Sequence, residues 1–137
     1  MTIAILTPIE CRPLRVCIAG SRGFSDYNLL KAKMDALLRF KHPHVCIVSG
    51  TANGADKLGE RYAAERGYEI EQHPADWDKH GKAAGPIRNT EMAECIDACV
   101  VFWNGKSRGT QHMIGACKRL GVDLRVIKNV DSIRSQS

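Results

Sequence analysis

Short apolar runs and amphipathic segments alternate along the chain. Residues 14–20 (LRVCIAG) form an apolar run that predicts a strand, and the segment 26–40 follows it. In that segment the apolar side chains recur at helical spacing, so they share one face of a predicted helix. These side chains are Leu29, Leu30, Met34, Leu37 and Leu38. The pattern therefore predicts one strand followed by one helix that covers it.

The same order repeats along the rest of the chain. Further strands are predicted over 44–50, 68–74, 98–105 and 122–128, and further helices over 55–67, 86–97 and 109–121. Strands separated by helices indicate a parallel sheet, because parallel neighbours need crossover connections that cover both faces. The predicted fold class is α/β, a single Rossmann-like domain with a five-stranded, mostly parallel sheet and helices on both faces.

The length of 137 residues fits one globular domain. We expect an N-terminal leader over 1–14, the Rossmann-like domain over 15–128 and a polar tail over 129–137. The sequence has no signal-peptide pattern and no apolar stretch near twenty residues. We therefore expect a cytoplasmic protein without a membrane partner.

Composition and charge exclude only a few classes of partner and cofactor. The net charge of +5 favours anionic partners, either nucleotides or nucleic acid. The six cysteines are expected to be reduced, because four lie in apolar strand or helix patterns. No C-x-x-C pair occurs, and the five histidines lack the spacing of metal ligands. Neither a metal site nor an organic cofactor is predicted.

Small and hydroxyl residues follow three of the predicted strands, in the sequences AGSRGFSD, SGTANGAD and FWNGKSRGT. The carboxyl ends of parallel strands meet at one sheet edge, where backbone amides before a helix can bind an anion. Arg22 and Arg108 lie on these corners, free to bind phosphate or to pair with a carboxylate such as Asp26. The corner residues expected to contact a phosphate-bearing ligand are Gly20, Ser21, Arg22, Ser49, Gly50, Thr51, Gly54, Asp56, Ser107, Arg108, Gly109 and Thr110.

A long polar connection over 73–92 follows the third strand, and long ordered connections are usually functional. Trp77 in this segment either stacks on a base or anchors the loop. Pro86 suits the first turn of a helix, which would bring Arg88 and Asn89 to the same sheet edge. Arg88 is the strongest single candidate for a ligand contact, and its removal is expected to leave the fold almost unaffected.

Four segments together resemble the YspA-like branch of the SLOG superfamily: IAGSRGFSDYNLL, IVSGTANGADKLGERYAAERG, PADWDKHGKAAGPIRNTEMAE and FWNGKSRGTQHMIGACKRLG. The resemblance covers residues 15 to 127. It implies a nucleotide-binding pocket built from these loops, and a homodimer. Members are thought to sense or process nucleotide-derived ligands, some of them in conflict between bacteria and phages. Relatives include the LOG-type phosphoribohydrolases and the DNA-processing protein DprA.

The LOG enzymes carry an Arg-Lys pair and a P-G-G-x-G-T-x-x-E corner whose glutamate serves hydrolysis. Here Arg88 and Asn89 match the pair in part, and Gly109 and Thr110 match the corner. Met113 stands at the glutamate position, where a thioether cannot replace a carboxylate. Another acid could substitute for it, although each has a structural role open to it. The candidates are Asp56, Asp76 and Glu91.

Three functions follow as hypotheses. The leading one is binding of a nucleotide or ADP-ribose-like ligand, as a sensor or as a sequestering protein for a signalling nucleotide, with Trp77 or Trp103 stacked on the base and no catalysis. The first alternative is a LOG-like hydrolase of N-glycosidic or phosphoester bonds with a substituted carboxylate. The second alternative is a DprA-like binder of single-stranded nucleic acid.

The corner SGTANGAD departs from the sequence SGGARGAD, which is commoner in the YspA-like pattern, because Asn53 replaces an arginine.

Overall fold

The computed structural model describes residues 13–38 and 44–128, and contains a five-stranded sheet in the order β3-β2-β1-β4-β5. Every neighbouring pair of strands is parallel, which confirms the predicted α/β class and extends "mostly parallel" to the whole sheet. The strands are β1 Leu14–Gly20, β2 Val45–Ser49, β3 Glu69–Gln72, β4 Ala98–Trp103 and β5 Asp123–Lys128. The predicted leader over 1–14 lies almost entirely outside the described residues, and the predicted tail over 129–137 lies wholly outside them.

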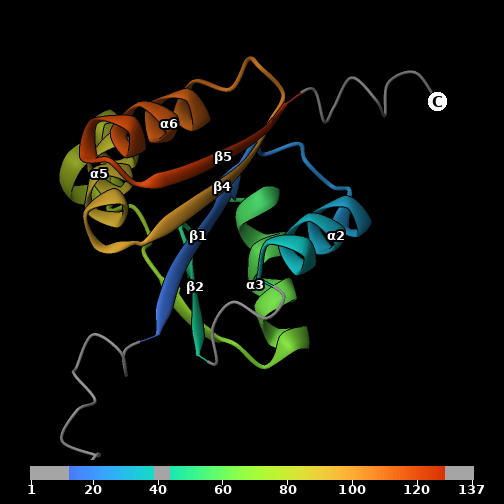
Figure 1. Ribbon diagram of the computed structural model, residues 1–137. Helices are drawn as coiled ribbons and strands as arrows, with labels where there is room; N and C mark the ends of the chain where they lie inside the picture. Colours follow the sequence, from blue (N-terminus) through green and yellow to red (C-terminus); the bar gives the residue numbers. More distant parts are fainter. Residues whose placement is uncertain (1–12, 39–43, 129–137) are drawn as a thin grey trace, which may run out of the picture.

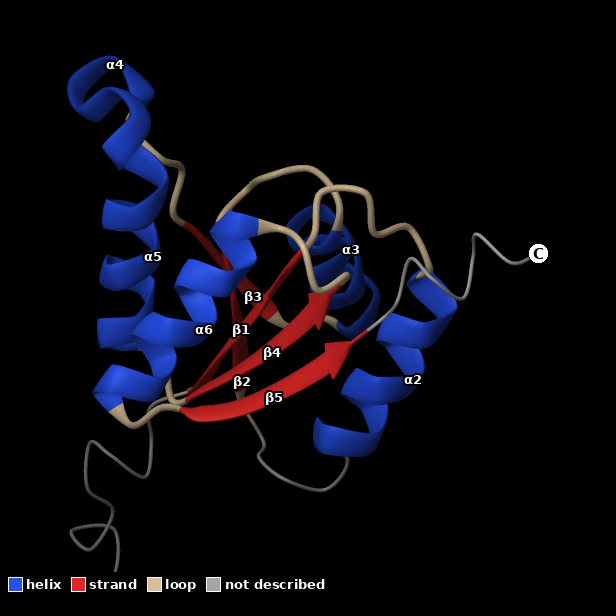
Figure 2. Ribbon diagram, turned by 90° about the horizontal axis from the view of Figure 1, so that it is seen from above, coloured by secondary structure: helices blue, strands red, loops and turns tan. Residues whose placement is uncertain are grey.

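Helices cover both faces of this sheet, with α2 and α3 on one face and α5 and α6 on the other (Figures 1 and 2). Their bounds are α2 Tyr27–Leu38, α3 Ala55–Arg66, α4 Trp77–His80, α5 Ala84–Cys95 and α6 Arg108–Leu120. No helix among the described residues is long and apolar enough to cross a membrane.

Two apolar cores lie on the two faces. The first gathers Leu30 and Met34 of α2 and Tyr62 of α3 against the central strands. The second packs Met92 of α5 and Met113 of α6 on the opposite face. All five residues of β2 are buried, because a strand covered on both faces needs a continuous apolar run rather than an alternating one. The predicted single domain therefore has its core divided by the sheet.

The strand order places a topological switch between β1 and β4. The chain runs from β1 outward through β2 to β3, then returns to the other side of β1 for β4 and β5. The connections that follow β1 and β4 consequently run in opposite directions, and a crevice opens at the carboxyl ends of these two strands. The loops after β1, β2 and β4 all border this crevice.

The connection over 73–92 has more regular structure than the sequence indicated. Its middle forms α4 and a 3-10 turn at Gly81–Ala83, which leads directly into α5 at Ala84. Asp76 caps α4, since its carboxylate accepts a hydrogen bond of 3.1 Å from the backbone N–H of Lys79. The segment is thus largely helical, and it lies beside the crevice.

Candidate functional site

A pocket with two adjoining chambers occupies this crevice. The inner chamber, about 160 Å³, is lined by Ala19, Gly20, Arg22, Ala52, Asp56, Trp77, Gly85, Pro86, Arg88, Asn89, Met92, Ser107, Gly109, Thr110 and Met113. The outer chamber, about 410 Å³, is lined by Arg22, Gly50, Thr51, Ala52, Asn53, Pro74, Ala75, Trp77 and Arg88. Arg22, Arg88 and Trp77 line both chambers. The chambers therefore form one site, with two cationic side chains and one aromatic side chain at the boundary between them.

The three corners pack directly against one another through their backbones. The N–H of Ser21 donates to Phe102 O at 2.9 Å, and Ser21 Oγ accepts from the N–H of Asn104 at 3.0 Å. A Cβ at Gly20 would lie 2.2 Å from Phe102 O. At Gly54, where φ is 85°, it would lie 2.3 Å from Ser21 O. Glycine is required at both positions because another backbone occupies the space of a side chain.

Asp56, on the first turn of α3, places a buried carboxyl group at the wall of the inner chamber. Asp56 is 6% exposed, and its Oδ2 accepts the backbone N–H of Ala52 at 3.1 Å. Burial raises the pKa of Asp56 to about 6, because desolvation outweighs the Ala52 hydrogen bond and the attraction of Arg88. Loss of the proton from this carboxyl group is therefore less favourable than from an exposed aspartate.

Arg88 joins the second corner to α5. Its Nη1 donates to the carbonyl oxygens of Gly50 and, at 3.3 Å, His73, while Nε donates to Asn89 Oδ1 at 3.1 Å. Asn89 Nδ2 in turn donates to Gly109 O at 3.2 Å, which connects α5 to the start of α6. The expectation that the fold hardly depends on Arg88 does not agree with this geometry, because the guanidinium satisfies backbone carbonyls of two loops.

Arg22 and Trp77 lie at the boundary between the chambers. Arg22 is exposed, and within the described residues its side chain makes no hydrogen bond or ion pair. The alternative partner, Asp26, accepts the N–H of Leu29 at 3.1 Å instead. Trp77 is 51% exposed, and a Cβ at Gly85 would lie 3.4 Å from its ring, so one edge of the indole lies against α5. A cation and an open aromatic face are thus available to a ligand.

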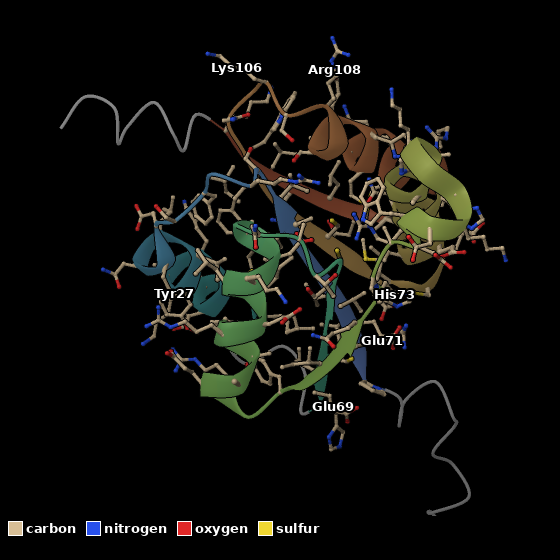
Figure 3. All side chains as sticks on the ribbon, turned by 180° about the vertical axis from the view of Figure 1, so that it is seen from behind. Tyr27, Glu69, Glu71, His73, Lys106 and Arg108 are labelled. Atoms are coloured by element: carbon tan, nitrogen blue, oxygen red, sulfur yellow. The ribbon has the colours of Figure 1, made fainter. Side chains whose placement is uncertain are left out.

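Most of the predicted contact residues line one or both chambers, but five do not. Ser49 Oγ is buried and donates to Glu60 Oε2 at 2.7 Å. Trp103 Nε1 donates to Ser107 O at 3.1 Å, so this indole fastens the third corner. Arg108 is exposed and points away from the body of the protein (Figure 3). The predicted residues that line neither chamber are Ser21, Ser49, Gly54, Trp103 and Arg108.

The floor of the inner chamber is apolar, which sequence reasoning missed. Met92 and Met113 are each 2% exposed and face the chamber from α5 and α6. Both fall on the apolar face of a predicted helix, and that pattern does not distinguish a core position from a pocket position. Of the three substitute acids, Asp56 alone lines a chamber, whereas Asp76 caps α4 and Glu91 is exposed on α5.

A separate cluster at β3 contains side chains of the kinds that bind metals. The ligand atoms of Glu71, His73 and Cys95 lie within 4.8 Å of one another, and Figure 3 shows Glu71 and His73 side by side. The guanidinium of Arg15 donates to Glu71 Oε2 at 2.5 Å and to Cys95 Sγ at 3.1 Å. Arg15 therefore forms an ion pair with Glu71 in this cluster, and ties β1 to β3 and α5.

The fold defines a Rossmann-like protein, with a pocket at the carboxyl ends of its central strands. Residues 14–80 match the family model of the YspA, cpYpsA-related SLOG family (YAcAr). The Gene 61 protein of Mycobacterium phage D29 is 38% identical over 115 residues, which covers 79% of this chain and 91% of that protein. The chain belongs to the YspA, cpYpsA-related SLOG family, as its motifs indicated.

The solved structure of DNA processing protein A (DprA) from Streptococcus pneumoniae has a similar fold, with a TM-score of 0.67. The alignment covers 94% of this chain but 58% of the DprA chain, at 16% sequence identity. At this identity the likeness concerns the fold, and the chain spans little more than half of the DprA chain.

Proposed function

We propose that this protein binds a nucleotide or ADP-ribose-like ligand in the two-chambered pocket, and acts as a sensor or a sequestering protein for a signalling nucleotide. The observation that carries the proposal is the boundary at which Arg22, Arg88 and Trp77 face both chambers. Two guanidinium groups beside an open indole suit a ligand that joins a phosphate to an aromatic ring. The family membership and the phage relative support a role in conflict between phage and host.

The lining suggests how such a ligand would lie. A phosphate at the boundary would receive charge-assisted hydrogen bonds from Arg22, whose guanidinium makes no hydrogen bond or ion pair among the described residues. A base would lie in the inner chamber, over the apolar floor of Met92 and Met113 and beside Trp77. This pose uses the apolar and the cationic parts of the pocket together.

One observation favours a second candidate function, a nucleotide hydrolase. Asp56 is a buried carboxyl group at the inner chamber with a pKa of about 6, which suits a general acid or base near neutral pH. Met113 replaces the glutamate of the LOG pattern, so Asp56 would have to act in its place. Release of free base or phosphate by the wild type, lost in Asp56→Asn, would establish this function instead of binding alone.

The binding proposal is tested by replacing Arg22. Calorimetric titration with ADP should show an affinity about ten- to a hundred-fold weaker in Arg22→Ala, because at least one charge-assisted hydrogen bond is lost. The melting temperature of the empty protein should stay nearly unchanged, since an exposed arginine contributes little to stability. Arg119→Ala removes an exposed arginine from the far end of α6 and serves as the matched control. Equal ADP affinity in all three proteins would contradict the proposal.

A further inference from the structure

The cluster of Glu71, His73 and Cys95 lies outside the pocket, since none of the three residues lines either chamber. Glu71 lies on β3 and His73 follows it at the spacing that brings two side chains to one side of a strand. Their Oε2 and Nε2 atoms are 2.5 Å apart. Cys95, the last residue of α5, brings the third group from a helix. The spacing of histidines along the sequence could not indicate a group assembled in this way.

The three ligand atoms are of the kinds that Zn²⁺ prefers. Protein zinc sites use thiolate sulfur, imidazole nitrogen and carboxylate oxygen, and this cluster offers one of each. The atoms lie within 4.8 Å of one another, whereas two ligands of one tetrahedral zinc ion lie roughly 3.5 Å apart. Rotation of these side chains is enough to close so small a difference. Mg²⁺ and Ca²⁺ suit the cluster less well, because both take oxygen ligands.

The guanidinium of Arg15 occupies the position between two of these ligand atoms. Its Nη2 lies 2.5 Å from Glu71 Oε2 and 3.1 Å from Cys95 Sγ, so the cluster already binds one cationic group. A further bond, from Nε to the carbonyl oxygen of Cys95 at 2.6 Å, holds the guanidinium beside the cluster. The side chains of Arg15, Glu71 and His73 are between 25% and 33% exposed. A metal ion can therefore reach the cluster from solvent, and the guanidinium can move out into solvent.

The charges and protons of such an exchange balance. Cys95 Sγ donates to the carbonyl oxygen of Met92 at 3.3 Å, so without a metal the sulfur carries its proton. A zinc–sulfur bond forms from the thiolate, and the proton goes to solvent. The negative charges of the Cys95 thiolate and the Glu71 carboxylate then match the charge of the ion. Water completes the tetrahedral coordination.

We propose that Glu71, His73 and Cys95 form a binding site for Zn²⁺, or for a similar divalent cation that binds sulfur, and that the ion enters by displacing the guanidinium of Arg15. The bound ion joins the edge strand β3 to the end of α5. The site is independent of the proposed nucleotide binding, because it shares no residue with the lining of the pocket.

Titration of the reduced full-length chain with Co²⁺, a spectroscopic substitute for Zn²⁺, tests the site. The wild type should bind one ion per chain and develop a thiolate-to-cobalt absorption band, which Cys95→Ser should lack. Competition for Zn²⁺ against a chromophoric chelator should give an affinity weaker by about tenfold or more in His73→Ala. Mg²⁺ in excess should not compete. Glu69→Gln removes a carboxylate at the start of the same strand, outside the cluster, and should bind Zn²⁺ as the wild type does.

Arg15→Gln tests the exchange between the guanidinium and the ion. Glutamine keeps an N–H donor for the carbonyl of Cys95 but removes the competing charge, so Zn²⁺ should bind about tenfold more tightly than in the wild type. Circular dichroism of each variant before titration confirms that it is folded. Zn²⁺ should also raise the melting temperature of the wild type, and this rise tests the site if Arg15→Gln does not fold.

The contrary results are equally specific. A wild type without the cobalt band, or without a rise in melting temperature on addition of Zn²⁺, would overturn the site. A band that persists in Cys95→Ser, or equal Zn²⁺ affinity in His73→Ala and the wild type, would show that the ion binds elsewhere. Weaker Zn²⁺ binding in Arg15→Gln than in the wild type would overturn the displacement of the guanidinium. None of these results changes the outcome of the ADP titration with Arg22→Ala.

Discussion

Replacing Gly54 with alanine should lower the free energy of unfolding by about 3 kcal/mol, because the added methyl group would overlap the backbone of the first corner. A Cβ at this position would lie 2.3 Å from Ser21 O and 2.5 Å from Arg22 O, both backbone atoms of the first corner. The φ of 85° adds the cost of a left-handed conformation. Urea denaturation followed by circular dichroism measures the change.

Gly67→Ala is the matched control for this prediction. Gly67 ends α3 with a φ of 73°, and a Cβ there would meet no heavy atom within 4 Å. The control therefore carries the cost of the left-handed conformation alone, about 1 kcal/mol. If both variants lost the same stability, the close packing of the first and second corners would not be a determinant of the fold.

The second large effect concerns pH. Asp56 has a pKa of about 6 in the folded protein against an ordinary aspartate value of 3.8, so the folded state holds the proton more tightly than the unfolded state. Stability that is present below about pH 4 is therefore lost as the pH rises through 6. Asp56→Asn resembles the protonated form at every pH. It should match the wild type at pH 4 and be more stable by up to about 3 kcal/mol at pH 7.

Denaturation curves of the two proteins at pH 4, 5, 6 and 7 measure this divergence. Asp78→Asn, which removes an exposed carboxylate from α4, is the control for a simple loss of surface charge. A variant of Asp56 that is less stable than the wild type at pH 7 would show that the attraction of Arg88 outweighs desolvation, and would reverse the sign of the pKa change.

The strand and helix order could be predicted because apolar periodicity follows burial directly. The run VCIVS becomes β2, buried throughout, and the spacing of Leu30, Met34 and Leu38 becomes the buried face of α2. The position of the pocket also followed from sequence, since the carboxyl ends of parallel strands must meet at one edge. For this reason each of the three glycine-containing corners contributes residues to the lining of the chambers.

The sequence could not indicate which side chains near these corners form hydrogen bonds to the protein and which remain exposed to the pocket. Arg88 and Arg22 are both arginines near a corner, yet Arg88 is bonded to carbonyl oxygens of two loops while Arg22 is exposed. Trp103 and Trp77 differ in the same way, one fastening a loop and the other lining the pocket. These assignments depend on loop positions within an ångström, which local sequence patterns do not specify.

The most direct test of the central claim, that the ligand binds at the carboxyl ends of the central strands, is a titration of the isotopically labelled protein with ADP-ribose followed by backbone amide NMR. We predict that the largest chemical-shift changes fall on residues 20–22, 49–56 and 107–110, together with the indole N–H of Trp77. Changes confined to the amino-terminal edge of the sheet, around Leu14 and Asp123, would contradict the claim, as would a spectrum that ADP-ribose leaves unchanged.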